Sequence, residues 1–298
     1  MDKEKSAFKK AISSRWFIYS VILFCTGLFF AWQLSNLLIK AHRDPAGPGR
    51  GPEMFSIPYE KGTIKTADGQ LLHTWFLKGK NGKAVILCHG VGADKSQMVT
   101  YAVFLYKAGY SVLMFDFRGH GENKESFISI GFIEVKDLEA AVAWLNELGY
   151  ENPGVLGISM GASVALRTAA KDNNFGAVVA DSPFATLNGM MAYRAKGMGL
   201  PYWPAVPAVK TLAKLRTGYN FNEVNPVEDV KNIRCPVFII HGLLDNNIPV
   251  ENGKEIFAAA NEPKELLLVS NAGHVDSHGT VQKEYERKVL DFFSKYLK

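Results

Sequence analysis

The chain of 298 residues has only three cysteines, Cys25, Cys88 and Cys235. Three cysteines cannot form a disulfide framework, and none of them belongs to a C-x-x-C pair or to a cysteine–histidine cluster with zinc spacing. Cys88 and Cys235 lie in or beside short apolar runs, where cysteine acts as a small core hydrophobe. The sequence therefore argues against redox chemistry and against a zinc site.

An excess of charge of one sign is absent from most of the chain. The basic residues of segment 1–50 account for the whole net charge of +5, and residues 51–298 are neutral. A nucleic-acid-binding protein needs its basic excess on the folded domain, so we exclude nucleic acid as a main partner. With 47% hydrophobic and 21% charged residues, the composition is that of a globular protein and excludes mostly disordered and collagen-like chains.

Charged residues are missing from the segment Trp16 to Ile39, which lies between Arg15 and Lys40. A helix of this length spans roughly 36 Å, and the hydrocarbon core of a bilayer is about 30 Å thick. A cleaved signal peptide is the alternative, but its apolar region is about 7 to 15 residues long and ends in a small-x-small site, which we do not find. We therefore predict an N-terminal tail over 1–15 and a transmembrane anchor over 16–40.

Basic residues on the two sides of this segment indicate its orientation. Five Lys or Arg precede it, and three follow it before Gly51. The positive-inside rule then predicts that the N-terminal tail is cytoplasmic and that the domain after the segment is extracytoplasmic. Residues 41–54 are rich in Pro and Gly, which predicts a stiff linker, and the folded domain is expected over 55–298.

Short apolar runs alternate with helix-length segments along this domain. Two β-type runs, Ser56 to Thr66 and Leu71 to Leu77, predict a hairpin around Asp68-Gly69. Further strands are predicted at Ala84–Cys88, Ser111–Phe115, Gly154–Ile158, Ala177–Ala180, Pro236–Ile240 and Glu265–Val269, and helices at 95–108, 133–149, 160–171, 250–260 and 281–297. Apolar strands separated by helices are typical of a mainly parallel sheet covered on both faces, whose chemistry gathers at the carboxyl ends of the strands.

One of these strand ends carries a motif of nucleophilic catalysis. Gly157-Ile158-Ser159-Met160-Gly161 matches G-x-S-x-G, and it stands between a predicted strand and a predicted helix, as a nucleophile elbow requires. Because a serine hydroxyl is a weak nucleophile at neutral pH, Ser159 needs a base within hydrogen-bond distance and an acid that orients the base.

Histidines at the other strand ends supply the candidates for the base. His274 follows the last predicted strand in a loop that is free to reach across the sheet, and we predict it to be the base, with His278 as the alternative. His89, His120 and His241 each precede a glycine where a strand or turn ends, and we expect them to shape loops.

The acid is predicted from chain order. Asp245 follows the penultimate strand, which gives the order Ser159, Asp245, His274 of the α/β-hydrolase triad. Asp181 is the alternative acid, whereas Asp276 lies too near His274 in sequence to orient it.

The oxyanion of the tetrahedral intermediate needs backbone N–H donors. We predict Met160, directly after the nucleophile, and Val91, in the loop after the first parallel strand, with Gly92 as the alternative to Val91. Asp116 and Arg118 follow another strand, and we assign them to a buried ion pair or a helix cap.

Together these motifs resemble the α/β-hydrolase superfamily from about Phe55 to the C-terminus. The resemblance rests on His89-Gly90, Asp116-Phe117-Arg118-Gly119-His120-Gly121, Gly157-Ile158-Ser159-Met160-Gly161, Asp181-Ser182-Pro183-Phe184, Cys235-Pro236-Val237-Phe238-Ile239-Ile240-His241-Gly242, Asp245 and Gly273-His274. Within the superfamily the chain is similar to small-capped, membrane-anchored bacterial serine hydrolases described as esterases, lipases or S9-like and S33-like peptidases. The resemblance implies an eight-stranded sheet, a Ser-His-Asp triad and neither a metal nor an organic cofactor.

The resemblance also implies a helical cap inserted at about 183–232. This segment contains Met190, Met191 and Trp203, which we predict to contact substrate. A cap rich in methionine and aromatic residues suits flexible apolar acyl chains. His-Gly-Val-Gly at 89–92 separates the chain from the hormone-sensitive-lipase branch, which has His-Gly-Gly-Gly there.

These observations predict a serine hydrolase that cleaves carboxylic esters through an acyl-enzyme, with a small-molecule acyl ester, including lipid-like esters, as its substrate. A serine at the elbow excludes the epoxide hydrolase and dehalogenase branches, which resemble this fold but place an aspartate there. Peptidase, amidase and acyl-thioesterase activities on the same triad are alternatives. A membrane-tethered binding module without catalysis is the alternative from another class. The sequence carries no indication of the oligomeric state.

Overall fold

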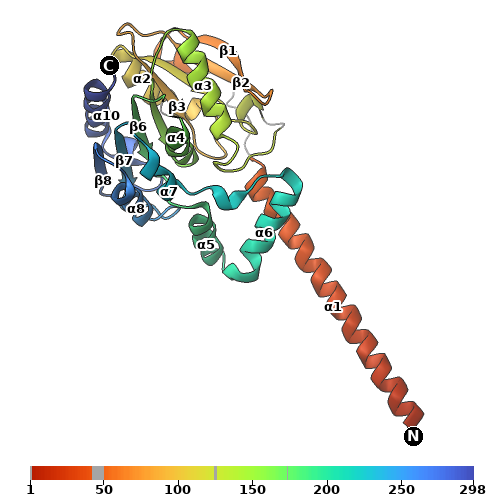
Figure 1. The fold of residues 1–298 in the computed structure, drawn as a ribbon. Coiled ribbons are helices and arrows are strands. Elements are labelled where there is room, and N and C mark those ends of the chain that lie inside the picture. Colours follow the sequence, from red (N-terminus) through yellow and green to blue (C-terminus); the bar gives the residue numbers. More distant parts are fainter. Residues whose placement is uncertain (1, 42–49, 124–125, 173) are drawn as a thin grey trace.

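The computed structural model describes residues 2–41, 50–123, 126–172 and 174–298. An α/β body holds a central sheet, and one long helix extends away from it (Figure 1). The sheet has eight strands in the order β1-β2-β4-β3-β5-β6-β7-β8. Strand β2 pairs antiparallel with β1 and β4, and all other pairs are parallel, so the predicted sheet is confirmed.

The strands lie close to the predicted runs. They are β1 Glu60–Lys65, β2 Leu71–Leu77, β3 Ala84–Cys88, β4 Ser111–Phe115, β5 Gly154–Ile158, β6 Ala177–Asp181, β7 Val237–Gly242 and β8 Lys264–Val269. Every residue of β3 to β7 is buried, which explains why these runs lack the polar alternation of a half-exposed strand. Strand β1 begins at Glu60, later than the predicted Ser56. Ser56 itself has a left-handed conformation and ends the 3-10 helix Pro52–Phe55.

Helices cover both faces of the sheet, as predicted. One apolar cluster joins one face to α3 Val135–Glu147, α4 Met160–Lys171 and α8 Glu251–Ala259, and a second joins the other face to α2 Val99–Lys107 and α10 Gln282–Tyr296. Two short helices, α7 Pro226–Asp229 and α9 Ser277–Thr280, lie in connections. The strands therefore end in loops at a shared edge, between the two helical layers.

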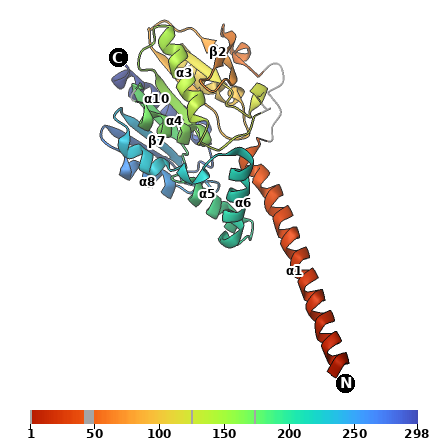
Figure 2. The ribbon, with the colours of Figure 1, turned by 45° about the vertical axis from the view of Figure 1, so that its right-hand side comes forward.

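The cap is a pair of helices between β6 and β7. These helices are α5 Leu187–Gly197 and α6 Tyr202–Thr217, within the stretch predicted as the cap. The Thr186 side chain caps α5 by accepting a hydrogen bond from the Gly189 backbone N–H at 2.9 Å. Figure 2 shows both helices on the side of the body from which the long helix departs.

The long helix α1 runs from Asp2 to Ile39, so it includes the predicted tail as well as the predicted span. Its stretch Ser14–Ile39 is long and apolar enough to cross a membrane. Its last turns pack on the body: Leu38 and Ile39 are buried, and the Ile39 carbonyl accepts a hydrogen bond from the Ile128 N–H at 3.0 Å. Most of the predicted linker, 42–49, lies outside the described residues.

Candidate active site

Ser159 stands at a sharp turn between β5 and α4. Its φ of 52° and ψ of −116° are unfavourable for a side-chain-bearing residue, and the turn depends on the glycines two residues to either side. A Cβ on Gly157 would lie 2.3 Å from the Gly161 carbonyl oxygen, and a Cβ on Gly161 would lie 2.2 Å from the Cys88 carbonyl oxygen. The turn is anchored by the Ser159 N–H, which donates to the Asp181 carbonyl at 2.8 Å.

The three residues chosen from the sequence form one hydrogen-bonded row. His274 Nε2 lies 2.9 Å from Ser159 Oγ, and His274 Nδ1 lies 2.7 Å from Asp245 Oδ2. Since a carboxylate only accepts, the Nδ1–H donates to Asp245, which leaves Nε2 free to accept the serine proton. All three side chains come from loops at the carboxyl ends of β5, β7 and β8. The arrangement has the geometry of a nucleophile, a general base and an orienting acid.

The loop after β7 holds Asp245 as an anion. Its Oδ1 accepts from the backbone N–H groups of Asn247 at 2.9 Å and Ile248 at 2.8 Å. Burial acts to raise the pKa of Asp245, but hydrogen bonds from His241, His274 and the Ile248 N–H outweigh it, and the pKa lies below its usual range. His241 also donates to the Ile248 carbonyl at 2.8 Å, so it shapes this loop as expected.

Two backbone N–H groups next to the serine remain available as donors. Among the hydrogen bonds of the described residues, none uses the N–H of Met160 or of Val91. Gly90, the residue before Val91, is not available as a donor, because its N–H already donates to Gln97 Oε1 at 2.9 Å. Gly90 lies against the nucleophile, and a Cβ on it would lie 3.4 Å from the Cβ of Ser159. Met160 and Val91 therefore suit the oxyanion hole expected from the sequence.

The alternative base has other partners. His278 Nε2 lies 3.1 Å from Glu286 Oε1, and the His278 ring lies 4.8 Å from the ring of Tyr101. These contacts hold His278 between α10 and α2, and within the described residues it forms no hydrogen bond with Ser159.

The alternative acid, Asp181, is buried and does not bind His274. It accepts from the hydroxyls of Ser182 at 3.1 Å and Ser277 at 3.4 Å. Burial raises the pKa of Asp181 to about 6, in contrast to the lowered pKa of Asp245. Asp276 is also away from the row, at the start of α9.

Two other histidines shape loops, as the sequence predicted. His89 Nε2 accepts from the Phe117 N–H at 3.1 Å, and its Nδ1–H donates to the Gly90 carbonyl at 2.8 Å. Burial, with the nearby charge of His120, lowers the pKa of His89, so its ring is neutral and suited to both bonds. His120 Nδ1 donates to the Arg118 carbonyl at 2.9 Å.

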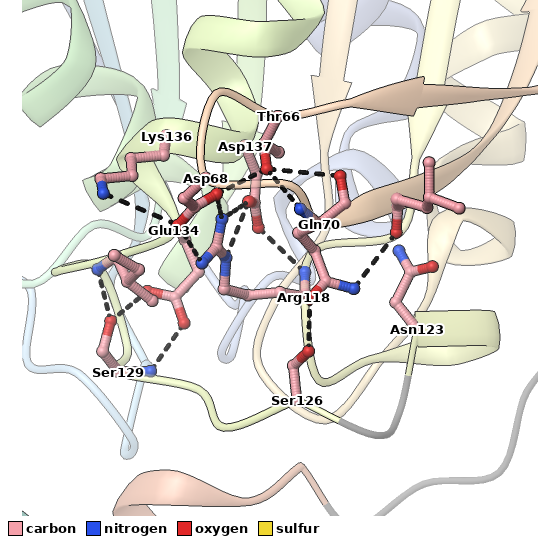
Figure 3. Close-up of polar contacts among 12 residues, drawn as sticks. Thr66, Asp68, Gln70, Arg118, Asn123, Ser126, Ser129, Glu134, Lys136 and Asp137 are labelled. Carbon is pink, nitrogen blue, oxygen red and sulfur yellow. Dashed lines mark hydrogen bonds and ion pairs between the residues drawn. The ribbon is translucent and has the colours of Figure 1, made fainter. Parts of the chain in front are cut away.

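Arg118 and Asp116 form separate buried ion pairs that brace the loop after β4. Figure 3 shows the Arg118 guanidinium between Asp68 and Asp137, which accept from it at 2.9 and 2.6 Å. Burial opposes the charge, but these hydrogen bonds raise the pKa of Arg118 above its usual range. Asp116 accepts from Lys95 Nζ at 2.7 Å. The sequence did not predict the partners Asp68, Asp137 and Lys95, because no spacing in the sequence links them to Arg118 or Asp116.

The structure brings two of the three predicted substrate contacts together. Met190 and Met191 line an apolar cavity of about 170 Å³ between α1, α5 and α6. Trp203 is 74% exposed and does not line this cavity, and its contact with substrate stays a prediction. Arg194 and Leu34 line the same cavity and were not expected there.

Comparison with known proteins shows the family to which the chain is similar. The family model of the prolyl oligopeptidase family, Peptidase S9, matches residues 96–298. The uncharacterized protein YqkD of Bacillus subtilis is 34% identical over 213 residues, 70% of each chain. YfhR of Escherichia coli, also uncharacterized, is 27% identical over 292 residues, 93% of this chain and 92% of its own.

A solved structure is similar over nearly the whole body. The Pyrococcus furiosus esterase Pf2001 superposes with a TM-score of 0.72 and 29% identity, covering 87% of this chain and 100% of the esterase chain. The α/β-hydrolase fold expected from the sequence is confirmed by this similarity.

Proposed function

Because this chain belongs to the prolyl oligopeptidase family of α/β-hydrolase-fold serine hydrolases, we propose that it hydrolyses carboxylic esters through an acyl-enzyme on Ser159. The observation that carries the proposal is the row of hydrogen bonds from Ser159 through His274 to Asp245, at 2.9 and 2.7 Å. A serine in such a row is activated without a metal or a cofactor.

In the first half of the reaction, Ser159 Oγ attacks the ester carbonyl carbon. Its proton passes to His274 Nε2, and Asp245 stabilises the imidazolium that forms. The N–H groups of Met160 and Val91 donate to the oxyanion of the tetrahedral intermediate. When the intermediate collapses, the carbon–oxygen bond to the alcohol breaks, and His274 gives the alcohol its proton.

In the second half, a water molecule attacks the acyl-enzyme. His274 takes a proton from this water, a second tetrahedral intermediate forms, and its collapse releases the carboxylic acid and returns the proton to Ser159 Oγ. The sum of the two halves is one ester and one water converted to one acid and one alcohol. The ionised Asp245 keeps His274 in the tautomer that both halves require.

The side chains of the cap favour the proposal of an acyl substrate. The cavity beside Met190 and Met191 is lined mainly by aliphatic side chains, and methionine adapts to flexible apolar chains. The similarity to an enzyme described as an esterase points in the same direction.

A peptidase on the same triad is the second candidate, because the family is named for oligopeptidases. A peptidase that binds the substrate amino terminus needs an acidic anchor near the pocket. The described residues that line the two cavities named here beside α5, of about 580 and 170 Å³, include no aspartate or glutamate. This favours the ester over the peptide.

We also propose that α1 is an uncleaved membrane anchor, with its N-terminus in the cytoplasm and the body outside. An apolar helix near the N-terminus is equally compatible with a signal sequence. However, the end of α1 is built into the body, since Leu38 and Ile39 are buried and the Arg216 guanidinium donates to Asn36 Oδ1 at 2.9 Å. Removal of α1 would expose the apolar surface that these residues cover.

The first experiment asks whether the full chain has a reactive serine. A fluorophosphonate probe, p-nitrophenyl esters from acetyl to palmitoyl, and an alanyl p-nitroanilide are applied to the wild type, to Ser159→Ala and to Ser163→Ala. Ser163 lies one turn further along α4 and its hydroxyl accepts from the Phe184 N–H, so it is a matched control serine. We expect labelling and ester turnover in the wild type and in Ser163→Ala, and neither in Ser159→Ala.

Other results would change the assignment. Turnover of the anilide without the esters would favour the peptidase. Folded protein that neither labels nor turns over any substrate would contradict the hydrolase mechanism and favour a binding module. Recovery of the intact chain, including α1, in carbonate-washed membranes supports the anchor, whereas a processed soluble chain contradicts it.

A further inference from the structure

Helix α6 of the cap lies along the C-terminal half of α1, and both helices run toward the body (Figures 1 and 2). Between them lies an apolar cavity of about 450 Å³, which we call the groove. Its walls carry no charged side chain; they are Phe24, Gly27, Leu28, Phe30, Ala31 and Leu34 of α1, together with Leu200, Pro201, Pro204, Ala205, Ala208 and Val209 at the start of α6.

This groove continues into the cap. Leu34, Leu200, Ala205 and Val209 line both the groove and the cavity that holds Met190 and Met191. Because the two cavities share these walls, they are adjacent, and we refer to them together as the apolar path from the surface of α1 to the space beside α5.

The path ends at a basic, polar cavity. Arg194 and Met198 line the apolar cavity and also a space of about 580 Å³ that includes Lys196, Asn246 and Asn247. Neither Arg194 nor Lys196 forms an ion pair within the described residues. This end lies beside the acid of the triad, because the Asn247 N–H donates to Asp245 at 2.9 Å. Two unpaired cations at the end of an apolar path suit an amphiphile with an anionic group.

The position along α1 places the groove at the depth of lipid tails. No charged residue lies between Trp16 and Ile39, and none lies in 197–209 at the start of α6. A hydrocarbon core of about 30 Å covers roughly 20 residues of a helix, so counting from Trp16 it includes Phe24 and Leu34 and ends before the turns of α1 that pack on the body. The cap surface at this level is apolar and exposed, with Met198, Tyr202 and Trp203. Trp203, which does not line the cavity of Met190 and Met191, thus lies where it would contact the bilayer.

We propose that the groove between α1 and α6 takes the acyl chain of an anionic lipid ester directly from the membrane, with α1 as one wall of the binding site. This proposal rests on the proposed ester hydrolysis and on α1 as an anchor. The acyl chain lies along the path past Ala205 toward Met190, and Arg194 and Lys196 hold the anionic head group. A lipid reaches such a site by lateral movement, without leaving the bilayer for water.

The test uses the full chain in lipid nanodiscs. Palmitoyl-oleoyl phosphatidylglycerol is the anionic substrate, phosphatidylcholine with the same chains is the neutral one, and p-nitrophenyl butyrate is a water-soluble ester. Ala205→Trp fills the path where the two cavities meet. Leu215→Trp adds the same ring to the same helix at a position that is 77% exposed and lines none of the cavities named here.

We expect Ala205→Trp to lower the ratio of phosphatidylglycerol to butyrate rates about tenfold or more, and Leu215→Trp to leave it unchanged. Arg194→Gln is expected to reduce the preference for phosphatidylglycerol over phosphatidylcholine. An unchanged ratio in Ala205→Trp would overturn the proposal, and so would cleavage of the soluble ester and a peptide anilide without either lipid.

A binding measurement separates this proposal from the proposed reaction. Phosphatidylglycerol with a diazirine on its acyl chain is photolysed in the nanodisc, and the labelled peptides are identified by mass spectrometry. Labelling of the α6 segment around Ala205 that Ala205→Trp abolishes supports the path even if no ester is turned over. Labelling confined to the free part of α1, and equal in both proteins, would exclude it.

Discussion

The carboxyl edge of the sheet and the cap differ in how their side chains are held. At the sheet edge, Ser159 and Asp245 are buried, and hydrogen bonds fix the whole row of catalytic side chains. The cap and α1 instead leave large apolar side chains exposed, among them Met198, Trp203 and Leu215. A rigid sheet edge whose polar side chains are hydrogen-bonded is suited to catalysis. An adaptable apolar cap is suited to determining substrate specificity. The difference predicts that changes at the edge act on rate and folding, whereas changes in the cap act on specificity.

The largest effect is expected at the two carboxylates of the sheet edge. Asp245→Asn removes the anion that orients His274 and stabilises the imidazolium, so kcat on a p-nitrophenyl ester should fall about 10⁴-fold. Asp181→Asn, at the neighbouring strand, should change kcat less than about threefold, because Asp181 does not contact His274. Steady-state kinetics of both variants check this, and equal losses would show that the edge acts as one unit rather than through one acid.

Two glycine substitutions compare the sheet edge and the cap in their effect on the free energy of unfolding. Gly161→Ala places a Cβ 2.2 Å from the Cys88 carbonyl oxygen, and the chain must shift, which should cost about 3 kcal/mol of unfolding free energy. Gly197→Ala, in cap helix α5, meets nothing within 4 Å and should be neutral or stabilise by about 0.5–1 kcal/mol. Unfolding by denaturant in detergent micelles measures both. Similar losses in the two variants would mean that the cap is as tightly constrained as the edge.

The sheet edge also predicts a dependence of stability on pH. Burial raises the pKa of Asp181 to about 6, from an ordinary value of 3.8. Between these values the folded state keeps a proton that the unfolded state releases, so stability falls as pH rises and stays lower above pH 6. Asparagine cannot ionise. The stability of Asp181→Asn relative to the wild type should therefore increase from pH 4 to pH 7, by about 3 kcal/mol at most.

Unfolding curves at pH 4.5 and pH 7.5 test the sign of this difference. Asp245 supplies the contrast, since its pKa is lowered and its ionised form contributes stability above the unfolded pKa that is lost as pH falls. Parallel pH profiles for the wild type and Asp181→Asn would contradict the assignment of a raised pKa to Asp181.

The same two regions differ in how far the sequence predicts them. The strands, the flanking helices and the elbow around Ser159 follow from local patterns, because a buried parallel strand is apolar throughout and a tight turn needs glycine. Asp245 and His274 were found because parallel strands bring their carboxyl ends to one edge. Topology alone therefore reduces the search for partners of Ser159 to a few loops.

The contacts of the cap could not be predicted from local sequence patterns or from sheet topology. Between Trp16 and Ile39 helix α1 has no charged face, so no periodicity shows which face packs on α6. Nothing near Ala205 in sequence indicates its contact with α1. Trp203 was predicted to contact substrate because the cap is rich in methionine and aromatic residues, but its side chain is exposed and does not line the cavity of Met190 and Met191. The ion pairs of Arg118 with Asp68 and Asp137 join separate elements, and their partners are set by the tertiary fold.

The smallest effect is expected where the two helices are tied by polar contacts. The Arg216 guanidinium donates to Ser35 Oγ at 2.5 Å and lies 4.1 Å from the centre of the Trp32 ring. Arg216→Gln should weaken the docking of α1 by about 1–2 kcal/mol, seen as roughly tenfold faster amide exchange in the last turns of α1. Arg287→Gln, which removes an exposed pair with Asp291, should leave this exchange unchanged. Exchange that is equally slow in Arg216→Gln would mean that apolar contact alone holds α1 against the cap, and the site wall would then depend on the surrounding lipid rather than on this arginine.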